Sequence, residues 1–537
     1  MKKMSGWVVA CTLLLLSTAL SGQDNTLRKE IEVKEVRSGF TVVPVGRNGL
    51  LVFYNMAKKG QGTWKFMHMD TTFVTLKEQE YAIGSALKPI DFGYREDEKK
   101  IYILFAKNKS SKVITYDLPT GEISQIAVQG KGKSRNLTDF RIRNGIALYG
   151  GHTLCSQVSE IPLKVLYPFW WTGSQLGIIR YKPHACYSVV DVAKGNSRTE
   201  KIQGGGNSFV SGISDAPGDE EGMVMSVATR KSHKTLLAHY FIYDSGQPEK
   251  FCESVLDDDY TLMNTRVFGK GKKDFFIAGN YCRGGGMTEQ VTTRSVRENL
   301  SDGLFFGRLV DGKTEFIKFY PLSDLNEFKS QIIASHAKWK SRSDRKAIER
   351  IQTRGIKKNL LIHEDVLSLN GYYVVVSEVY WPLYTTECSN SYVDGRFVEH
   401  CKTVFAGYIY SYCIAVAFDD QGNIVWDYSY PLDMISSYVL HPKFLTYVEG
   451  RDIRFMYTNM FGRQCSFLIR DGKKEGGVTF TGATSRMTGI ENNSTGNNVM
   501  LWYDGKFVAY GSSKKPDQKG SSKKSKNSDR YFFVQEI

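Results

Sequence analysis

A repeated unit of short strands joined by polar turns is the feature that most constrains this chain. It is clearest in residues 91–126, where apolar, β-branched stretches alternate with turn residues such as Pro119-Thr120-Gly121. Similar units return at residues 264–320, 363–430 and 442–481, and an incomplete one at residues 486–534. One such all-β unit cannot bury its apolar face alone, so neighbouring copies must stack against one another.

Stacked sheets of this number must close into a ring, because open sheet edges promote aggregation. We therefore predict an all-β fold, a β-propeller. Counting the units favours seven blades, with eight as the near alternative and two smaller propellers as a third arrangement. We expect residues 23–537 to form one domain, whose opening strand at residues 31–36 pairs with the C-terminal blade.

The N-terminus is typical of a secretory signal peptide, which we predict over residues 1–22. Lys2 and Lys3 precede the apolar run Trp7–Leu20, which is too short to span a bilayer and ends in small and polar residues. We therefore expect an exported protein of the periplasm, the outer membrane or the cell surface.

The chain is basic, with 71 Lys and Arg against 56 Asp and Glu and a formal net charge of +15. The excess is concentrated in two segments, residues 325–358 and 511–529. In the first, Leu325, Phe328 and Ile332 share one helical face, which predicts a basic helical insertion that either covers a sheet edge or contacts a partner. The second is rich in lysine and serine, and we predict a disordered loop there.

A positive balance is compatible with nucleic-acid binding, but an exported protein rarely meets nucleic acid as its ligand. An acidic protein partner or acidic lipid headgroups are better candidates. We expect a partner protein of the envelope, and we regard peripheral membrane contact through the basic segments as possible.

Eight cysteines follow the predicted signal peptide, and an even number in an exported protein permits disulfides. The best candidate pair is Cys388 and Cys401, which flank a hairpin-like stretch with Asp394-Gly395 at its expected turn. For the remaining cysteines, disulfides and free buried thiols are both open. The sequence has no CxxC pair, so a zinc ribbon or a thioredoxin-like site is disfavoured.

Catalytic motifs are weak throughout the sequence. Gly132-Lys133-Ser134 lacks the earlier glycine and the following helix of a phosphate-binding loop, and neither GxSxG nor HExxH occurs. Glu364, Asp365 and Glu378 fall in one unit, but sequence cannot place two of them across a cleft, as a glycosidase requires. We therefore expect no catalytic residue, no metal and no cofactor, and we favour a protein that is not an enzyme.

Two aromatic stretches are the candidate binding residues. The segment EVYWPLY carries Glu378, Tyr380, Trp381 and Tyr384, and a second cluster contains Trp170-Trp171. Because proline ends strand pairing, we expect the aromatic side chains around it to project into a loop, where they could contact protein or sugar. The alternative is that they form part of the aromatic core between blades.

Residues 302–433 resemble a group of exported Bacteroidota β-propeller-like envelope proteins of undefined function. The matching stretches are DGLFFGRLVDGKTEFIKFYPLSDL, EVYWPLY and AGYIYSYCIAVAFDDQGNIVWDYSYPL. The resemblance brings no catalytic residues. It implies an envelope propeller of the kind that serves in that phylum as a subunit of outer-membrane export or assembly machines.

The leading hypothesis is a non-enzymatic envelope propeller that acts as a protein-binding scaffold or as a subunit of an outer-membrane-associated export or assembly complex. The alternative is an exported propeller that binds or processes glycans through the EVYWPLY aromatics and the nearby acids.

Overall fold

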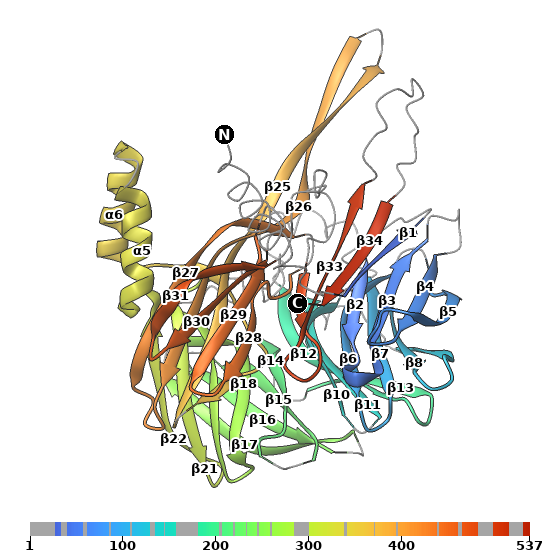
Figure 1. Cartoon of the computed structure of the whole chain (residues 1–537). Helices are drawn as coiled ribbons and strands as arrows, with labels where there is room; N and C mark the ends of the chain where they lie inside the picture. Colours follow the sequence, from blue (N-terminus) through green and yellow to red (C-terminus); the bar gives the residue numbers. More distant parts are fainter. Residues whose placement is uncertain are drawn as a thin grey trace, which may run out of the picture.

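The computed structural model shows an antiparallel β-propeller, which confirms the predicted fold class (Figure 1). The predicted signal peptide, Trp170, Trp171 and residues 515–529 lie outside the residues that the structure describes. These are residues 27–33, 40–56, 62–84, 87–107, 110–128, 135–143, 145–156, 181–202, 207–218, 221–231, 234–243, 246–257, 260–283, 300–337, 341–369, 371–393, 396–437, 440–459, 464–481, 498–514 and 530–536.

Seven of the sheets formed by the described residues have four strands. Six of these are consecutive along the chain or nearly so. They are β2 (Thr41–Pro44), β3 (Leu50–Asn55), β4 (Thr63–Met69) and β5 (Thr75–Ala82); β6 (Lys88–Arg95), β7 (Lys100–Lys107), β8 (Ser110–Asp117) and β9 (Ile123–Ala127); β10 (Arg135–Arg143), β11 (Ile146–Ser156), β12 (Tyr181–Asp191) and β13 (Asn196–Lys201); β14 (Ser208–Asp215), β15 (Met223–Lys231), β16 (Lys234–Ile242) and β17 (Pro248–Asp257); β18 (Tyr260–Gly271), β19 (Asp274–Arg283), β21 (Gly303–Val310) and β22 (Lys313–Pro321); and β28 (Leu445–Glu449), β29 (Asp452–Thr458), β30 (Gln464–Arg470) and β31 (Lys473–Thr481).

The seventh four-stranded sheet closes the ring by joining the two ends of the described chain. Its order is β1 (Arg28–Val33), β34 (Arg530–Glu536), β33 (Phe507–Lys514) and β32 (Asn498–Leu501). The antiparallel register of β1 and β34 runs from Arg28 opposite Gln535 to Val33 opposite Arg530. The predicted pairing of the opening strand with the last blade is therefore confirmed. Gly511–Lys514, expected to begin a disordered loop, instead belong to β33, because they pair with β34.

One sheet is larger than the others. It contains β20 (Leu300–Ser301), β23 (Lys358–Ile362), β24 (Leu367–Leu369), β25 (Tyr372–Val393), β26 (Arg396–Phe418) and β27 (Ile424–Ser437). With this enlarged sheet included, the described strands form eight sheets, of which seven are regular four-stranded blades.

Tight turns between strands follow from local sequence. Asp311-Gly312 joins β21 to β22, and Asp471-Gly472 joins β30 to β31, with φ of 48° and 74° at the first pair and 47° and 75° at the second. Positive φ at both central residues is the geometry of a two-residue hairpin turn, and Asp-Gly is a favoured sequence for it. These dipeptides are therefore reliable markers of the repeat.

The core is divided into clusters that lie between neighbouring sheets, as stacking of the repeats requires. Between the first two sheets, for example, Trp64 packs edge-on against Phe105 with ring centroids 4.9 Å apart. At the closure, Phe532 of β34 lies 4.6 Å from Phe40, which directly precedes β2. Aromatic contacts of this kind join several pairs of neighbouring blades.

The helical insertion consists of α5 (Asn326–Ala337) and α6 (Arg342–Arg354), after the short 3-10 turn η3 (Leu322–Asp324); a second such turn is η1 (Gly46–Asn48). Phe328 and Ile332 of α5 are buried in the core between the β18–β22 sheet and the enlarged sheet. At the start of α5, Asp427 of β27 accepts hydrogen bonds from the amides of Asn326 and Glu327 at 3.2 and 2.9 Å. In the described residues, neither helix is long and apolar enough to cross a bilayer.

Replacing Phe532 tests the importance of ring closure. Phe532 is fully buried, so Phe532→Ala should lower the free energy of unfolding by about 3–5 kcal/mol, the usual cost of truncating a buried phenylalanine. Urea denaturation followed by tryptophan fluorescence measures the change. Phe532→Leu is the control and should cost less, because it leaves a smaller cavity; equal stability of Phe532→Ala and wild type would show that the closure contributes little.

Candidate functional site

A buried ion network lies where the first strands of several sheets meet. Asp139 of β10 accepts a hydrogen bond from the Ile213 amide of β14 at 3.0 Å, and it pairs with the Arg266 guanidinium of β18. Arg266 also donates to the His363 carbonyl, just after β23, at 3.2 Å. The Arg266 and Asp139 side chains are only 6% and 2% exposed. One ion pair therefore links four sheets of the ring.

The network has a more open arm at Arg141 and Glu364. Arg141 lies two residues beyond Asp139 on β10 and binds Glu364 at 2.9 Å, whereas its distance to Asp139 is 3.9 Å. Burial lowers the pKa of Arg141, but the Glu364 and Asp139 carboxylates raise it by more than burial lowers it. The net shift is therefore upward. Burial raises the pKa of Glu364, but Arg141 outweighs it and the net shift is downward. Both groups are therefore charged in the folded protein.

Glu378 of β25 extends the network to the next sheet. Its carboxylate is fully buried and accepts hydrogen bonds from the amides of Lys443 at 2.8 and 2.9 Å and of Phe444 at 2.8 Å. Its Oε1 also lies 2.9 Å from His363 Nε2. Three hydrogen-bonding partners replace the water that Glu378 loses on burial, so the base of β25 is held to the segment before β28.

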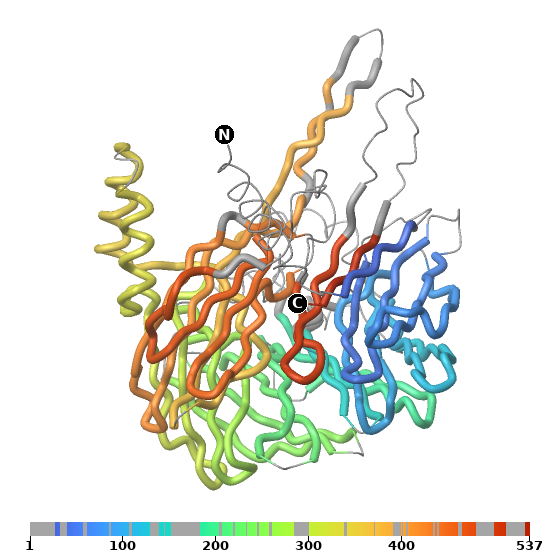
Figure 2. Tube along the Cα trace, in the orientation of Figure 1, coloured from blue at the N-terminus to red at the C-terminus, as the bar shows by residue number. Residues whose placement is uncertain are grey.

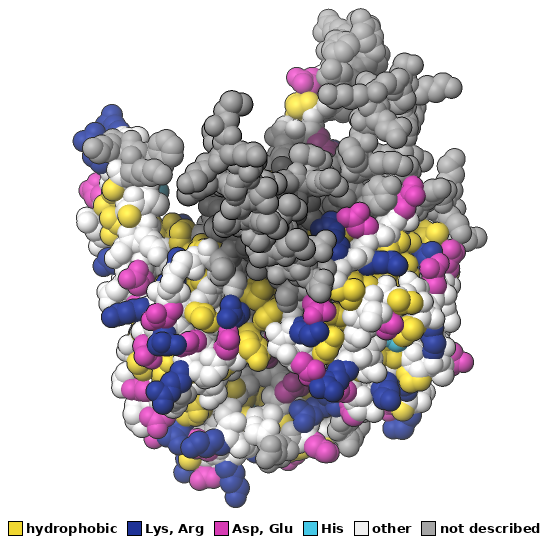
Figure 3. Space-filling view, in the orientation of Figure 1, with side chains coloured by type: hydrophobic (Ala, Val, Ile, Leu, Met, Phe, Trp, Pro, Cys, Tyr) yellow, Lys and Arg dark blue, Asp and Glu magenta, His cyan; other side chains and the backbone are white. Residues whose placement is uncertain are grey.

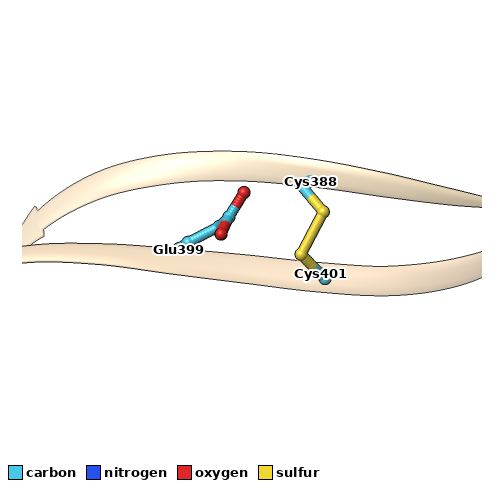
Figure 4. Close-up of side chains that lie close together, drawn as sticks. All are labelled: Cys388, Glu399 and Cys401. Carbon is cyan, nitrogen blue, oxygen red and sulfur yellow. A yellow bond between two sulfur atoms is a disulfide. The ribbon is translucent and has the colours of Figure 1, made fainter.

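Two groups in the described residues have the spacing of metal ligands. Asp91, Asp139 and Glu364 bring carboxylate oxygens within 4.8 Å of one another. Arg266 and Arg141 already pair with Asp139 and Glu364, so we interpret these acids as members of the ion network. The second group, Cys388, Glu399 and Cys401, has its two sulfurs joined to each other, as Figure 4 shows.

The enlarged sheet carries a long hairpin. We call it the arm and define it as residues 383–407 of β25 and β26. The strand β23 pairs with β25 only as far as Tyr380, and β27 pairs with β26 only from Tyr408 inward. The two strands continue to pair with each other as far as Val393 and Arg396. The arm is thus a two-stranded ribbon that projects away from the ring (Figures 1 and 2).

A disulfide joins the two strands of the arm, as predicted. Cys388 and Cys401 lie directly opposite each other in the register, with Cα atoms 4.0 Å apart. Both residues are exposed to solvent. Two isolated strands are only marginally stable in water, so a covalent link is an effective way to keep the ribbon paired.

Free buried thiols account for five other cysteines in the described part of the chain: Cys186, Cys252, Cys282, Cys413 and Cys465. Burial raises the pKa of Cys252 to about 12 and that of Cys282 to about 11. A thiol with such a pKa holds almost no thiolate at neutral pH, so these two are poor nucleophiles and act as packing residues.

The residues predicted for binding in EVYWPLY are separated by the structure. Glu378 and Tyr380 are buried, and Tyr380 packs with Tyr410 in the aromatic core. For Tyr380 this agrees with the alternative expectation, in which the aromatic residues belong to the core between blades. Trp381 is half-buried, and Tyr384 is 44% exposed at the base of the arm. Tyr384 is therefore the residue of this segment most open to a partner.

The expectation that Pro382 ends strand pairing was wrong. The strand β25 continues through Pro382, which lies opposite Tyr408, to Val393. The register shifts on both sides, between Val379 and Tyr380 and between Leu383 and Tyr384, and β23 no longer pairs at this point. A proline is tolerated beside irregularities and an open edge, because it has no amide hydrogen to donate.

The sequence analysis missed most of the ion network. Asp139, Arg141, Arg266 and Lys443 were not singled out, since each is an isolated charge in an ordinary strand or loop. One signal was available: Asp139 and Arg141 are two residues apart in β10, so these opposite charges share one face of the strand. Opposite charges at that spacing on an inner strand indicate a buried polar network.

The chain matches no protein-family model and no curated protein sequence. Among solved structures, it is similar to the polysaccharide lyase Uly1, with 10% identity over 95% of this chain and 99% of that one and a TM-score of 0.34. It is also similar to the WD40 domain of SCAP from fission yeast, with 7% identity, coverage of 96% and 98%, and a TM-score of 0.36. The Dos1 propeller gives 8% identity, coverage of 82% and 84%, and a TM-score of 0.36. With TM-scores this low, these likenesses carry no conclusion about the present chain.

Removing Asp139 should strongly destabilise the ring. Asp139→Ala leaves the buried Arg266 guanidinium without its carboxylate, and breaking a buried ion pair in this way costs about 3–5 kcal/mol. The matched control is Asp274→Ala, which removes the more exposed pair with Arg308 and should cost about 1 kcal/mol or less. Urea denaturation of both variants gives the comparison, and equal losses would contradict the assigned role of the network.

Lys443 should make stability depend on pH. Burial lowers the pKa of Lys443 from 10.5 to about 8, although the Glu378 carboxylate opposes the shift. Between these values the unfolded chain carries the proton and the folded chain does not, so the contribution of Lys443 to stability improves as pH rises from 8 to 10.5.

The variant Lys443→Met removes this titration. The free energy of unfolding of the variant minus that of wild type should be larger at pH 7 than at pH 10. Urea denaturation at both pH values measures this difference. Lys313→Met, at an exposed turn, is the control for the loss of a lysine. A difference between Lys443→Met and wild type that stays constant with pH would contradict the argument.

Proposed function

We propose that this protein is an exported, non-enzymatic envelope propeller that binds a partner protein through its arm, within an outer-membrane-associated complex. The observation that carries the proposal is the arm itself: a ribbon linked by a disulfide that extends beyond the ring (Figure 2). A surface ribbon of this length contributes little to the core of its own chain, and binding is the usual role of such extensions on a rigid scaffold.

The outer edges of the arm suit recognition by strand addition. Beyond Tyr380 and Tyr408, no third strand from the described residues pairs with the ribbon. Unpaired strand edges offer backbone donors and acceptors to an extended segment of another chain. The exposed ring of Tyr384 at the base of the arm supplies an aromatic contact of the kind enriched in protein interfaces.

The arm has a firm base. Glu378 lies only a few residues before the arm on β25, and its three partners hold that strand within the ion network. A recognition element held in one orientation loses less entropy on binding than a flexible one. The network therefore supports the proposed binding without contacting the partner.

Glycan binding is the second candidate, and it relies on the same exposed Tyr384 beside the half-buried Trp381. Aromatic rings suit sugar as well as protein contacts. A glycan array probed with wild type and Tyr384→Ala separates the two functions. A glycan signal that is lost in Tyr384→Ala favours glycan binding. A silent array together with capture of a protein favours partner binding through the arm.

Deleting the arm should abolish partner capture. Residues 385–404 can be replaced by Asn-Gly, because Tyr384 and Phe405 are opposite each other in the register and a two-residue turn can join them. Affinity purification from solubilised envelopes, read by mass spectrometry, should recover a partner with wild type and at least roughly tenfold less with the deletion, a loss expected when a central contact is removed.

The melting temperature controls for folding and should stay close to that of wild type, since the described side chains of the deleted segment, at positions 385–389, 399 and 401–403, are exposed. The double variant Cys388→Ala/Cys401→Ala keeps every other contact of the arm and should give intermediate capture, because the ribbon loses its cross-link. Capture that is unaffected by the deletion, or no partner for wild type, would refute the proposal.

A further inference from the structure

The outward face of α6 carries an unusual concentration of uncompensated positive charge. All the basic residues of this helix are exposed: Arg342, Arg345, Lys346, Arg350 and Arg354. Within the described residues, none of them makes an ion pair with an acid. Figure 3 shows Lys and Arg side chains gathered at the upper end of the helical pair.

Helical geometry places these charges on one side. With 3.6 residues per turn, the basic residues fall on one half of the helix, and Ile348 and Ile351 fall on the other. Ile351 packs against the core beneath α5, so the basic half must face outward. Asp344 is on the inner half, where its side chain bonds His336 of α5 at 3.1 Å. Glu349 is the one acid of α6 on the outward half.

Arginines elsewhere on the described surface are treated differently. Arg308 binds Asp274 through two hydrogen bonds of 2.9 Å, and Arg470 binds Asp452 through two of 2.7 and 2.6 Å. Arg454 reaches Glu449 at 2.7 Å. These three blade guanidinium groups are thus neutralised by neighbouring acids, whereas the five basic residues of α6 have no such partner among the described residues, which points to an external anionic ligand.

We propose that the outward face of α6 binds the phosphate-bearing headgroups of an anionic membrane surface. Guanidinium groups match phosphate oxygens in a two-pronged geometry, and several basic residues on one helix add their attraction to an anionic lipid surface. The outward half of α6 exposes no large apolar residue, whereas protein interfaces centre on buried aromatic or apolar groups. This composition favours a charged lipid surface over an acidic protein.

Membrane binding of this kind would be peripheral. With its apolar residues turned toward α5, α6 has nothing to insert among the acyl chains, so the attraction is electrostatic and weakens as salt rises. In Figure 1, α6 and the arm extend toward the same side of the ring.

Vesicle sedimentation tests the inference with the full mature chain. Wild type should bind vesicles of phosphatidylglycerol and phosphatidylethanolamine at low salt, bind phosphatidylcholine vesicles weakly, and be released by high salt. The variant Arg345→Glu/Lys346→Glu/Arg350→Glu should bind the anionic vesicles at least roughly tenfold less, since each basic residue near the surface contributes to the attraction.

The matched control is Lys313→Glu/Lys473→Glu/Lys474→Glu, which makes the same charge change at the exposed starts of β22 and β31 and should keep most vesicle binding. The arm deletion should also keep it, which separates this inference from the proposed partner binding. Equal loss in both charge variants, or no binding of wild type to anionic vesicles, would refute the proposal. Binding of wild type to polyglutamate but not to the vesicles would overturn it in favour of an acidic protein.

Discussion

The ion pair between Arg266 and Asp139 is the interaction on which the centre of the propeller depends. Both side chains are nearly inaccessible, and a charge in such a place is tolerated only when its partners replace the lost water. Asp139 also accepts a hydrogen bond from the Ile213 amide, and Arg266 also donates one to the His363 carbonyl. Together with other hydrogen bonds between these sheets, such as that from the Val267 amide to Ser214 Oγ at 3.0 Å, these directional bonds hold the sheets in one relative position.

In the part of the chain that the structure describes, the two largest departures from regularity occur in or beside the enlarged sheet. The arm extends β25 and β26 beyond their neighbours, and α5 and α6 enter the chain just before β23. The helix α5 fills the core against this sheet, which leaves α6 as the exposed partner of the pair. One blade has thus gained two projecting elements, while the described strands of the other blades form four-stranded sheets. This division is what a repeat scaffold permits, because each blade contacts only its neighbours.

The fold could be predicted because its signals are local. Turn dipeptides such as Asp311-Gly312 mark the repeat, and the Cys388–Cys401 disulfide follows from the symmetric spacing of a hairpin. The network could not be predicted, since Arg266 meets its partners Asp139 and His363 across 127 and 97 residues of sequence. The length of the arm was missed for another reason: Pro382 is a local signal for a strand end, and an open edge with flanking bulges overrides it.

The closing sheet has a consequence for the order of folding. Arg28 and Gln535, which face each other there, are separated by 507 residues. A chain synthesised from its N-terminus presents β1 first, and β1 has to wait for the last strand to arrive before it can pair. Middle blades can form on their neighbours alone, but the ring stays an open arc until then. During that interval its two terminal blades are exposed, and a chain cut short near its C-terminus would remain in this state permanently.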